Sequence, residues 1–174
     1  MEVFAAIKKR HSVRAFEKRE IPKEKILKIL EAGRLAPSAH NIQPWHFVVV
    51  TEEEKKRKIA KSRFAKFLSE CSAIIVGCGD KKASPKWYKV DVSIALQNMV
   101  LAAVSLGLGT CWVGSFDEKE VKKLLRIPER FEIVALIALG YEKKKIDLQG
   151  KILHLVRRRK ELREIASFNE FGKF

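Results

Sequence analysis

The spacing of apolar and polar residues along the chain predicts helices that alternate with strands. The clearest helix opens at Pro22, repeats apolar residues at helical spacing from Ile26 to Leu35, and is stopped by Pro37. Asp117 is placed to act as the N-cap of a later surface helix. The pattern predicts helices over 3–9, 22–36, 52–62 and 117–127, strands over 46–51, 72–79 and 131–141, and a strand or extended loop over 109–116.

Residues 90–106 have a different pattern, because they are apolar on nearly every side of a helix. Such a helix must be enclosed by protein on nearly every side. One layer of a domain this small can hardly provide that, which predicts packing against a second subunit. We therefore expect a single α+β domain over residues 1–174, with helices on both faces of a mixed, mostly antiparallel central sheet and a long buried helix at a homodimer interface.

Length and composition agree with one domain. The chain has 174 residues, of which 47% are hydrophobic, enough for a real core. The apolar run at the N-terminus is too short for a signal peptide, and no stretch of about 18 apolar residues is available to span a membrane. The sequence predicts a cytoplasmic protein without a membrane partner.

The formal net charge of +15 raises the possibility of nucleic-acid binding. However, the basic segments 51–67 and 117–130 mix acidic with basic residues at helical spacing, as solvated helix faces do. We expect no nucleic-acid partner, although a basic nucleic-acid-binding module stays open as an alternative.

Several kinds of site are not indicated. Cys71, Cys78 and Cys111 form no C-x-x-C pair and are expected to be reduced and buried, and the four histidines lack ligands at suitable spacing, so no metal is predicted. The glycine pairs 77/79 and 107/109 have neither the third glycine nor the order of a dinucleotide loop, and are read as a strand end and a helix C-cap. Asp91 is either a catalytic acid or a carboxylate bonded to a tyrosine or backbone group across an interface.

Of the kinds of site considered, phosphate binding without a glycine-rich loop is the one that the sequence still allows. Arg10, Ser12 and Arg14 in "RHSVRAF" alternate along an extended segment, so two guanidiniums and a hydroxyl can converge on one anion. Arg157 and Arg159 repeat the spacing near the C-terminus. A solvated patch is the alternative reading of each cluster taken alone.

The loop between Pro37 and Pro44 combines fixed geometry with directional hydrogen-bonding groups on Ser38 and Asn41. A rigid, amide-bearing loop suits the hydroxyls and ring edges of a small planar ligand. The alternative is that these groups satisfy only their own backbone.

Together, these segments resemble the flavin-dependent nitroreductase family. "RHSVRAF" looks like its phosphate motif, "APSAHNIQPWHFVVV" like its second signature, "DVSIALQNMVLAAVSLGLGTCWVGSF" like its central helix and flavin-contacting strand, and "RRKELREIASFNEFG" like its C-terminal segment. Two departures lie in the tail, where Glu161 replaces a proline and Arg163 an acid. The chain also lacks the extra helices of longer members.

The resemblance implies a homodimer with FMN at the subunit interface. By position, the phosphate and ribityl chain would be held by one group of residues: Arg10, His11, Ser12 and Arg14, closed by Arg157 and Arg159. A loop from the other subunit would approach the flavin through Pro37, Ser38, Ala39 and Asn41. The backbone along the isoalloxazine ring would come from Trp112, Val113, Gly114 and Ser115.

The implied activity is hydride transfer from NADPH or NADH through FMN to an aromatic acceptor such as a nitroaromatic, a quinone or a flavin, with ping-pong kinetics. Because the chemistry takes place at FMN N5, no side chain is expected to be catalytic. Relatives of this fold also dehalogenate aromatic rings or break down flavin, so both reactions stay open. A flavin-binding protein without catalysis is a further alternative.

Overall fold

The computed structural model describes residues 1–61, 65–143 and 159–174 of the chain. The chain divides into two compact units, Met1–Lys143 and Lys144–Phe174. Helices of the first unit are α1 (Val3–Lys9), α2 (Lys23–Arg34), α3 (Glu53–Ile59), α4 (Tyr88–Ser105) and α5 (Glu118–Leu125), with 3-10 turns η1 (Ala39–Asn41) and η2 (Lys66–Ser69). Its strands are β1 (Trp45–Val50), β2 (Ala73–Asp80), β3 (Gly109–Val113) and β4 (Phe131–Gly140). Each element that the sequence pattern predicts in this unit is present.

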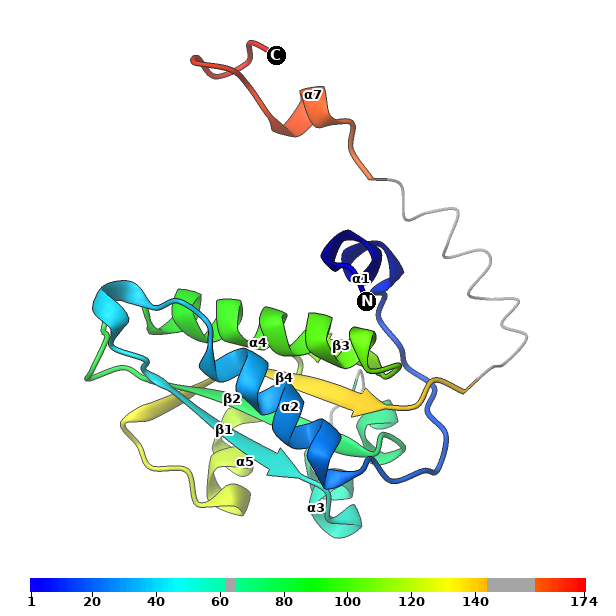
Figure 1. The fold of residues 1–174 in the computed structure, drawn as a ribbon. Helices are drawn as coiled ribbons and strands as arrows, with labels where there is room; N and C mark the ends of the chain where they lie inside the picture. Colours follow the sequence, from blue (N-terminus) through cyan, green and yellow to red (C-terminus); the bar gives the residue numbers. More distant parts are fainter. Residues whose placement is uncertain (62–64, 144–158) are drawn as a thin grey trace. The chain divides into compact units, whose positions relative to one another are not determined.

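The four strands form one sheet in the order β1-β2-β4-β3 (Figure 1). All three pairings are antiparallel. Within the described ranges, parallel pairing is limited to an isolated bridge between Ser12 and Thr110, at the outer edge of β3. The expected α+β architecture is confirmed, and β1 and β3 are the two edge strands of the described sheet.

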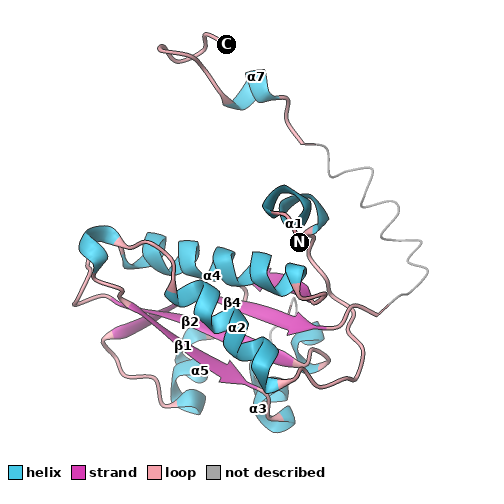
Figure 2. Ribbon diagram, viewed as in Figure 1, coloured by secondary structure: helices cyan, strands magenta, loops and turns pink. Residues whose placement is uncertain are grey.

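Helices cover both faces of this sheet, α2 and α4 on one and α3 and α5 on the other (Figure 2). Neighbouring residues of β2 show how the strands serve two cores. Ile75 packs toward Ile29 and Leu96 on the α2 and α4 face, whereas Ile74 packs on the α3 and α5 face. A strand buried on both faces is apolar at every position, which explains its unbroken hydrophobic sequence.

The long helix α4 buries one side and exposes the other within a single chain. Its inner residues include Leu96 and Met99, which are at most 1% exposed. On its outer side, Val90 is 47% exposed and Ile94 37% exposed. The prediction that this helix is enclosed on nearly every side is therefore not met by one chain alone.

Two further sequence expectations can be compared with the structure. The three cysteines are free and buried, as predicted. The apolar pattern of α2 overestimates its buried face, because Leu27 is 53% exposed and Leu35, just past the helix, is 66% exposed. Among the described helices, none is long and apolar enough to cross a membrane.

The described part of the second unit contains the short helix α7 (Leu162–Ile165). Glu161 and Glu164 form a reciprocal capping box at its start. The rings of Phe168 and Phe174 contact each other with their centroids 5.5 Å apart. These contacts give the segment a local structure of its own.

Candidate functional site

The basic segment that contains Arg10, Ser12 and Arg14 lies against the edge of the sheet. The N–H of Val13 donates to the carbonyl of Thr110 at 2.9 Å, and Val13 itself is buried. Arg14 is exposed, while Arg10 and Ser12 are partly exposed. The chain therefore fixes the segment through its backbone and an apolar side chain, and leaves the polar side chains accessible.

Two paired glycines make this close approach possible. Gly109 of β3 lies opposite Gly140 of β4 in the ladder. A Cβ at Gly109 would lie 2.8 Å from Val13 Cγ2, and a Cβ at Gly140 would lie 2.7 Å from Phe16 Cδ1. Because real Cβ atoms do not approach that closely, both positions need glycine for the segment to pack on the sheet.

His11 joins the segment to the end of β4. Its Nε2 lies 2.9 Å from Glu142 Oε1, and its Nδ1 lies 3.1 Å from the carbonyl oxygen of Lys9. The hydrogen bond to Glu142 raises the pKa of His11, while partial burial opposes the shift and the Lys9 carbonyl adds to it. His11 is thus held by the protein close to Arg10 and favours its positively charged form.

We predict that the imidazole signals of His11 titrate above the ordinary pKa of about 6.5. Since the folded-state pKa is raised, the pair stabilises the fold fully below about pH 6.5, and the contribution is lost as pH rises through the folded-state pKa. NMR titration of Glu142→Gln should return the midpoint toward 6.5. Glu54→Gln on α3 is the control, and an unchanged midpoint in Glu142→Gln contradicts the pairing.

The loop before β1 has an unusual backbone. His40, Asn41 and Gln43 have φ values of 51°, 56° and 53°. Left-handed conformations are uncommon for residues other than glycine, and three in four residues require compensating contacts. The loop therefore has a specific shape that an ordinary connecting turn does not need.

Side chains within the loop provide some of these contacts. Ser38 Oγ accepts from the N–H of Gln43 at 2.9 Å, and Gln43 Nε2 donates to the carbonyl oxygen of Asn41 at 3.2 Å. The N–H of Ala39 donates to Asp91 Oδ1 on α4 at 3.2 Å. The alternative in which loop groups satisfy only their own backbone accounts for Ser38 but not for Ala39.

The strand end predicted to follow a flavin ring is partly accessible. Trp112 is partly buried and Val113 is buried, whereas Gly114 and Ser115 are exposed just after β3. Among the described residues, apart from Gly114 and its two chain neighbours, no atom lies within 4 Å of where a Cβ of Gly114 would be. Because a strand rises about 3.3 Å per residue, Thr110 beside the basic segment lies about 13 Å from Gly114. An extended ligand can follow this edge, with an anion at one end and a ring at the other.

The loop and the basic segment lie at diagonally opposite corners of the sheet. Trp45, where the loop enters β1, aligns through Gly79 with Glu132 at the start of β4. Thr110, beside the basic segment, aligns with Leu139 near its end. The seven-residue offset corresponds to about 23 Å along the strands, and three strand spacings add about 14 Å across them. One chain therefore brings the basic segment and β3 together, but not the loop.

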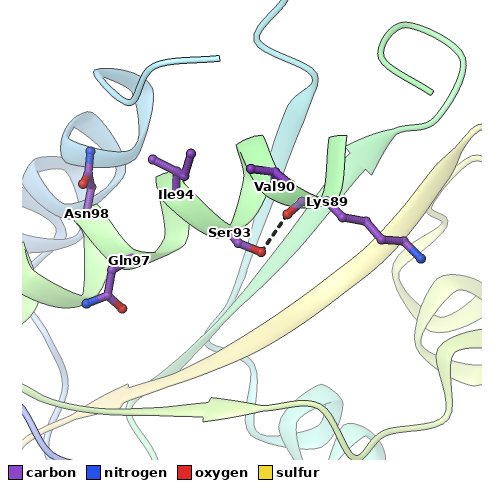
Figure 3. A pocket seen from close by; sticks show the side chains of 6 residues that line it. All are labelled: Lys89, Val90, Ser93, Ile94, Gln97 and Asn98. Carbon is purple, nitrogen blue, oxygen red and sulfur yellow. Dashed lines mark hydrogen bonds between the residues drawn. The ribbon is translucent and has the colours of Figure 1, made fainter. Parts of the chain in front are cut away.

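The outer face of α4 carries an open groove of about 530 Å³ (Figure 3). Two rows of side chains at four-residue spacing line it, and all of them come from this helix: Lys89, Ser93 and Gln97 in one row, and Val90, Ile94 and Asn98 in the other. The apolar side chains of Val90 and Ile94 lie there beside polar ones, a mixture typical of a surface that contacts another protein.

The predicted phosphate contacts of Arg157 and Arg159 cannot be located relative to the basic segment and β3. Arg157 lies outside the described residues. Arg159 is described and exposed, and belongs to the second unit. Their role toward a phosphate therefore stays a prediction.

Comparison of the sequence with known protein families identifies the family to which the chain belongs. The model of the nitroreductase family matches residues 7–73 and 65–141. A proposed NADH dehydrogenase/NAD(P)H nitroreductase of Archaeoglobus fulgidus is 40% identical over 154 residues, covering 84% of this chain and 88% of that protein. The chain belongs to the nitroreductase family. Nitroreductase family enzymes are oxidoreductases, and this protein is an enzyme of that class.

Solved structures of nitroreductase family proteins agree with the fold. A proposed NADH dehydrogenase/NAD(P)H nitroreductase of Parabacteroides distasonis has a TM-score of 0.85 and 32% identity, covering 97% of this chain and 98% of that chain. An FMN-dependent nitroreductase of Clostridium difficile has a TM-score of 0.78 and 29% identity, covering 97% and 99%. The resemblance inferred from the sequence motifs is confirmed.

Sequence reasoning missed one residue, Glu142, and the partner of another, Asp91. Glu142 pairs with His11 across 131 positions, and no local spacing could reveal it. Asp91 was noted as a lone carboxylate on an apolar helix, and the backbone bond proposed for it exists, but to Ala39 of the same chain. In both cases the partner was set by the fold.

Proposed function

We propose that this protein is a homodimeric FMN-dependent oxidoreductase that transfers hydride from NADH or NADPH to a small aromatic acceptor. One observation supports the proposed dimer: the loop 37–41 and the basic segment 10–14 lie at opposite corners of one sheet. A single flavin can contact both only if a second copy of the chain supplies one of them. Membership of the family and the FMN-dependent relative support the choice of cofactor.

The proposed dimer interface is the outer face of α4. Val90 and Ile94 expose apolar surface there beside polar side chains, within a groove lined by this one helix. Burying that surface against a second copy would meet the expectation, drawn from its apolar sequence, that the helix is enclosed. In this proposal residues 1–174 form one functional domain, to which the second unit contributes Arg157 and Arg159.

The chemistry of the exposed groups fits FMN. Arg10 and Arg14 offer guanidinium groups, and Ser12 a hydroxyl, on a segment whose position is fixed by Val13. Guanidinium groups bind phosphate through charge-assisted, often bidentate hydrogen bonds. His11, whose pKa is raised by Glu142, adds positive charge beside them. In this proposal the segment binds the phosphate, and the edge of β3 follows the rest of the cofactor.

When bound, FMN supplies hydride transfer at N5, from the nicotinamide to the acceptor. The protein orients the ring along Trp112–Ser115, where backbone N–H groups can stabilise negative charge that develops on it. The loop 37–41 of the second copy would contact the flavin through Pro37, Ser38, Ala39 and Asn41. Donor and acceptor would occupy one site in turn, which predicts ping-pong kinetics, and no side chain is required as a catalytic acid or base.

The first test is the anaerobic visible spectrum of the purified protein, before and after addition of NADPH and then of NADH. We expect flavin bands that bleach with at least one donor. Protein that neither copurifies with flavin nor binds added FMN contradicts the proposal. Bands that persist with both donors would instead indicate a flavin-binding protein without this catalysis.

The acceptor can be sought with the reduced protein from the same experiment. Anaerobic addition of a nitroaromatic, a quinone or a halogenated phenol, each in a separate sample, should restore the flavin bands if the compound is reduced. Return of the bands with the first two, but not the third, supports reduction of nitro or quinone groups over dehalogenation. Product analysis by mass spectrometry identifies the bond that changed.

A further inference from the structure

Asp91 is a buried carboxylate on a helix whose other buried residues are mostly apolar. It lies in the first turn of α4 and is 3% exposed. Its Oδ1 accepts the N–H of Ala39, whereas its Oδ2 is buried and has no hydrogen-bond partner among the described residues. Burying a polar oxygen without a donor disfavours folding. An apolar side chain would suit this position better if packing were its only role.

The loop that Asp91 contacts is shaped by internal bonds but not held in place by them. The bonds of Gln43 to Ser38 and Asn41 join loop residues to one another. They can maintain the left-handed backbone without fixing where the loop lies. A backbone bond from Asp80 to Pro44 secures only the end that enters β1.

The bond between Asp91 and Ala39 secures the other half of the loop. It joins residues 52 positions apart and links the start of η1 to the first turn of α4. The preceding residue, Val90, faces the outer groove, so Asp91 connects the loop to the helix that carries the proposed interface.

We propose that Asp91 is a positioning residue for the flavin: through the N–H of Ala39 it holds the loop 38–41 in the place from which the loop contacts FMN bound to the second copy. This inference rests on the proposed function. It assigns a residue outside the expected contact set, acting through the loop and without touching the cofactor.

Two substitutions of Asp91 separate the hydrogen bond from packing. Asp91→Asn keeps an oxygen that can accept from Ala39, whereas Asp91→Leu has the same number and branching of heavy atoms and no acceptor. The affinity of the apoprotein for FMN is measured by quenching of flavin fluorescence, together with the visible circular dichroism of the bound flavin and the Tm of the apoprotein. We expect Asp91→Leu to raise the Kd for FMN about tenfold and to alter the dichroism, with no fall in Tm, and Asp91→Asn to stay within about threefold of wild type.

A third variant removes the donor and leaves α4 unchanged. Ser38 has φ −142° and ψ 155°, the extended conformation that a residue before proline prefers, and Ala39 begins a 3-10 helix. Ala39→Pro should therefore fit the backbone while deleting the N–H that Asp91 accepts. Its Kd for FMN should rise to the same extent as in Asp91→Leu, and the double variant should show no further loss.

The outcomes separate this inference from the proposed function. If the wild-type protein binds no FMN, the proposed function fails first. If the wild type binds FMN and both Asp91→Leu and Ala39→Pro bind it equally well, Asp91 has no positioning role. Equal losses in Asp91→Leu and Asp91→Asn also overturn the inference, since the retained acceptor should rescue binding. If Asp91→Leu does not fold, Ala39→Pro decides alone.

Discussion

Replacing Ile94 with glutamate is expected to convert the proposed dimer into single chains and to weaken the proposed binding of FMN. Ile94 lies between Val90 and Asn98 in one row of the α4 groove and is 37% exposed in one chain. In the proposed dimer this side chain is buried against the second copy. An uncompensated charge there costs about 3–5 kcal/mol, and each 1.4 kcal/mol is about a tenfold change in Kd. The dimer should therefore dissociate at least about a hundredfold more readily.

Light scattering coupled to size-exclusion chromatography measures the effect directly. The variant should elute with the mass of one chain, 19.9 kDa, at concentrations where the wild type has twice that mass. Lys119→Gln on α5 is the control, because it changes the net charge by the same one unit on the opposite face of the sheet. A variant that stays dimeric means that α4 is not the interface. A monomer that still binds FMN as tightly as wild type means that the loop 37–41 is not supplied by a second copy.

The sequence predicted the elements of the first unit well, because each has a strong local signal. Asp117 caps α5 as expected, its Oδ1 accepting the N–H of Glu120 at 3.1 Å. Gly107 has φ 79° just after α4, which matches the C-cap interpretation. Helix α4 begins two residues before the predicted start, since the N–H of Tyr88 bonds to the carbonyl of Ser84. Caps, breakers and periodicity act over a few residues and can be read from the chain directly.

Burial was harder to predict, because it depends on what lies opposite each element. Leu27 fits the apolar spacing of α2, yet the helix packs on α4 with its other side, where Ile29 is fully buried. The spacing gives the helical period but not the width of the covered face. The even hydrophobicity of α4 correctly indicated an unusual helix, although one chain covers only half of it.

In the candidate site, too, local motifs were predictable from the sequence and long-range contacts were not. The motif "RHSVRAF" identified the basic segment, but its location at β3 depends on Gly109 and Gly140, which are far apart in sequence and paired in the sheet. The hydrogen-bonding groups of Ser38 and Asn41 indicate a binding loop, but no residue type in the loop predicts its left-handed backbone. The residue types indicate which side chains could bind a ligand, whereas the positions of those side chains relative to one another are known only from the fold.

Replacing Arg14 with alanine is expected to weaken binding of FMN but not of riboflavin. Arg14 is exposed on a segment that Val13 fixes to β3, so its removal should leave that backbone contact in place. A charge-assisted hydrogen bond contributes about 1.5–3 kcal/mol, which corresponds to a roughly 10- to 100-fold rise in the Kd for FMN. Riboflavin lacks the phosphate, and its Kd should change by less than about threefold.

Both affinities can be measured by quenching of flavin fluorescence, so the ratio of the two isolates the phosphate contribution. Lys123→Ala on α5 removes one exposed positive charge at another place and should leave that ratio unchanged. The preference for FMN in the wild type should also fall with added salt, because an exposed guanidinium is partly screened. Equal weakening of both ligands would show that Arg14 acts on the ring or on the fold, and an unchanged ratio with undiminished affinity would remove Arg14 from the phosphate site.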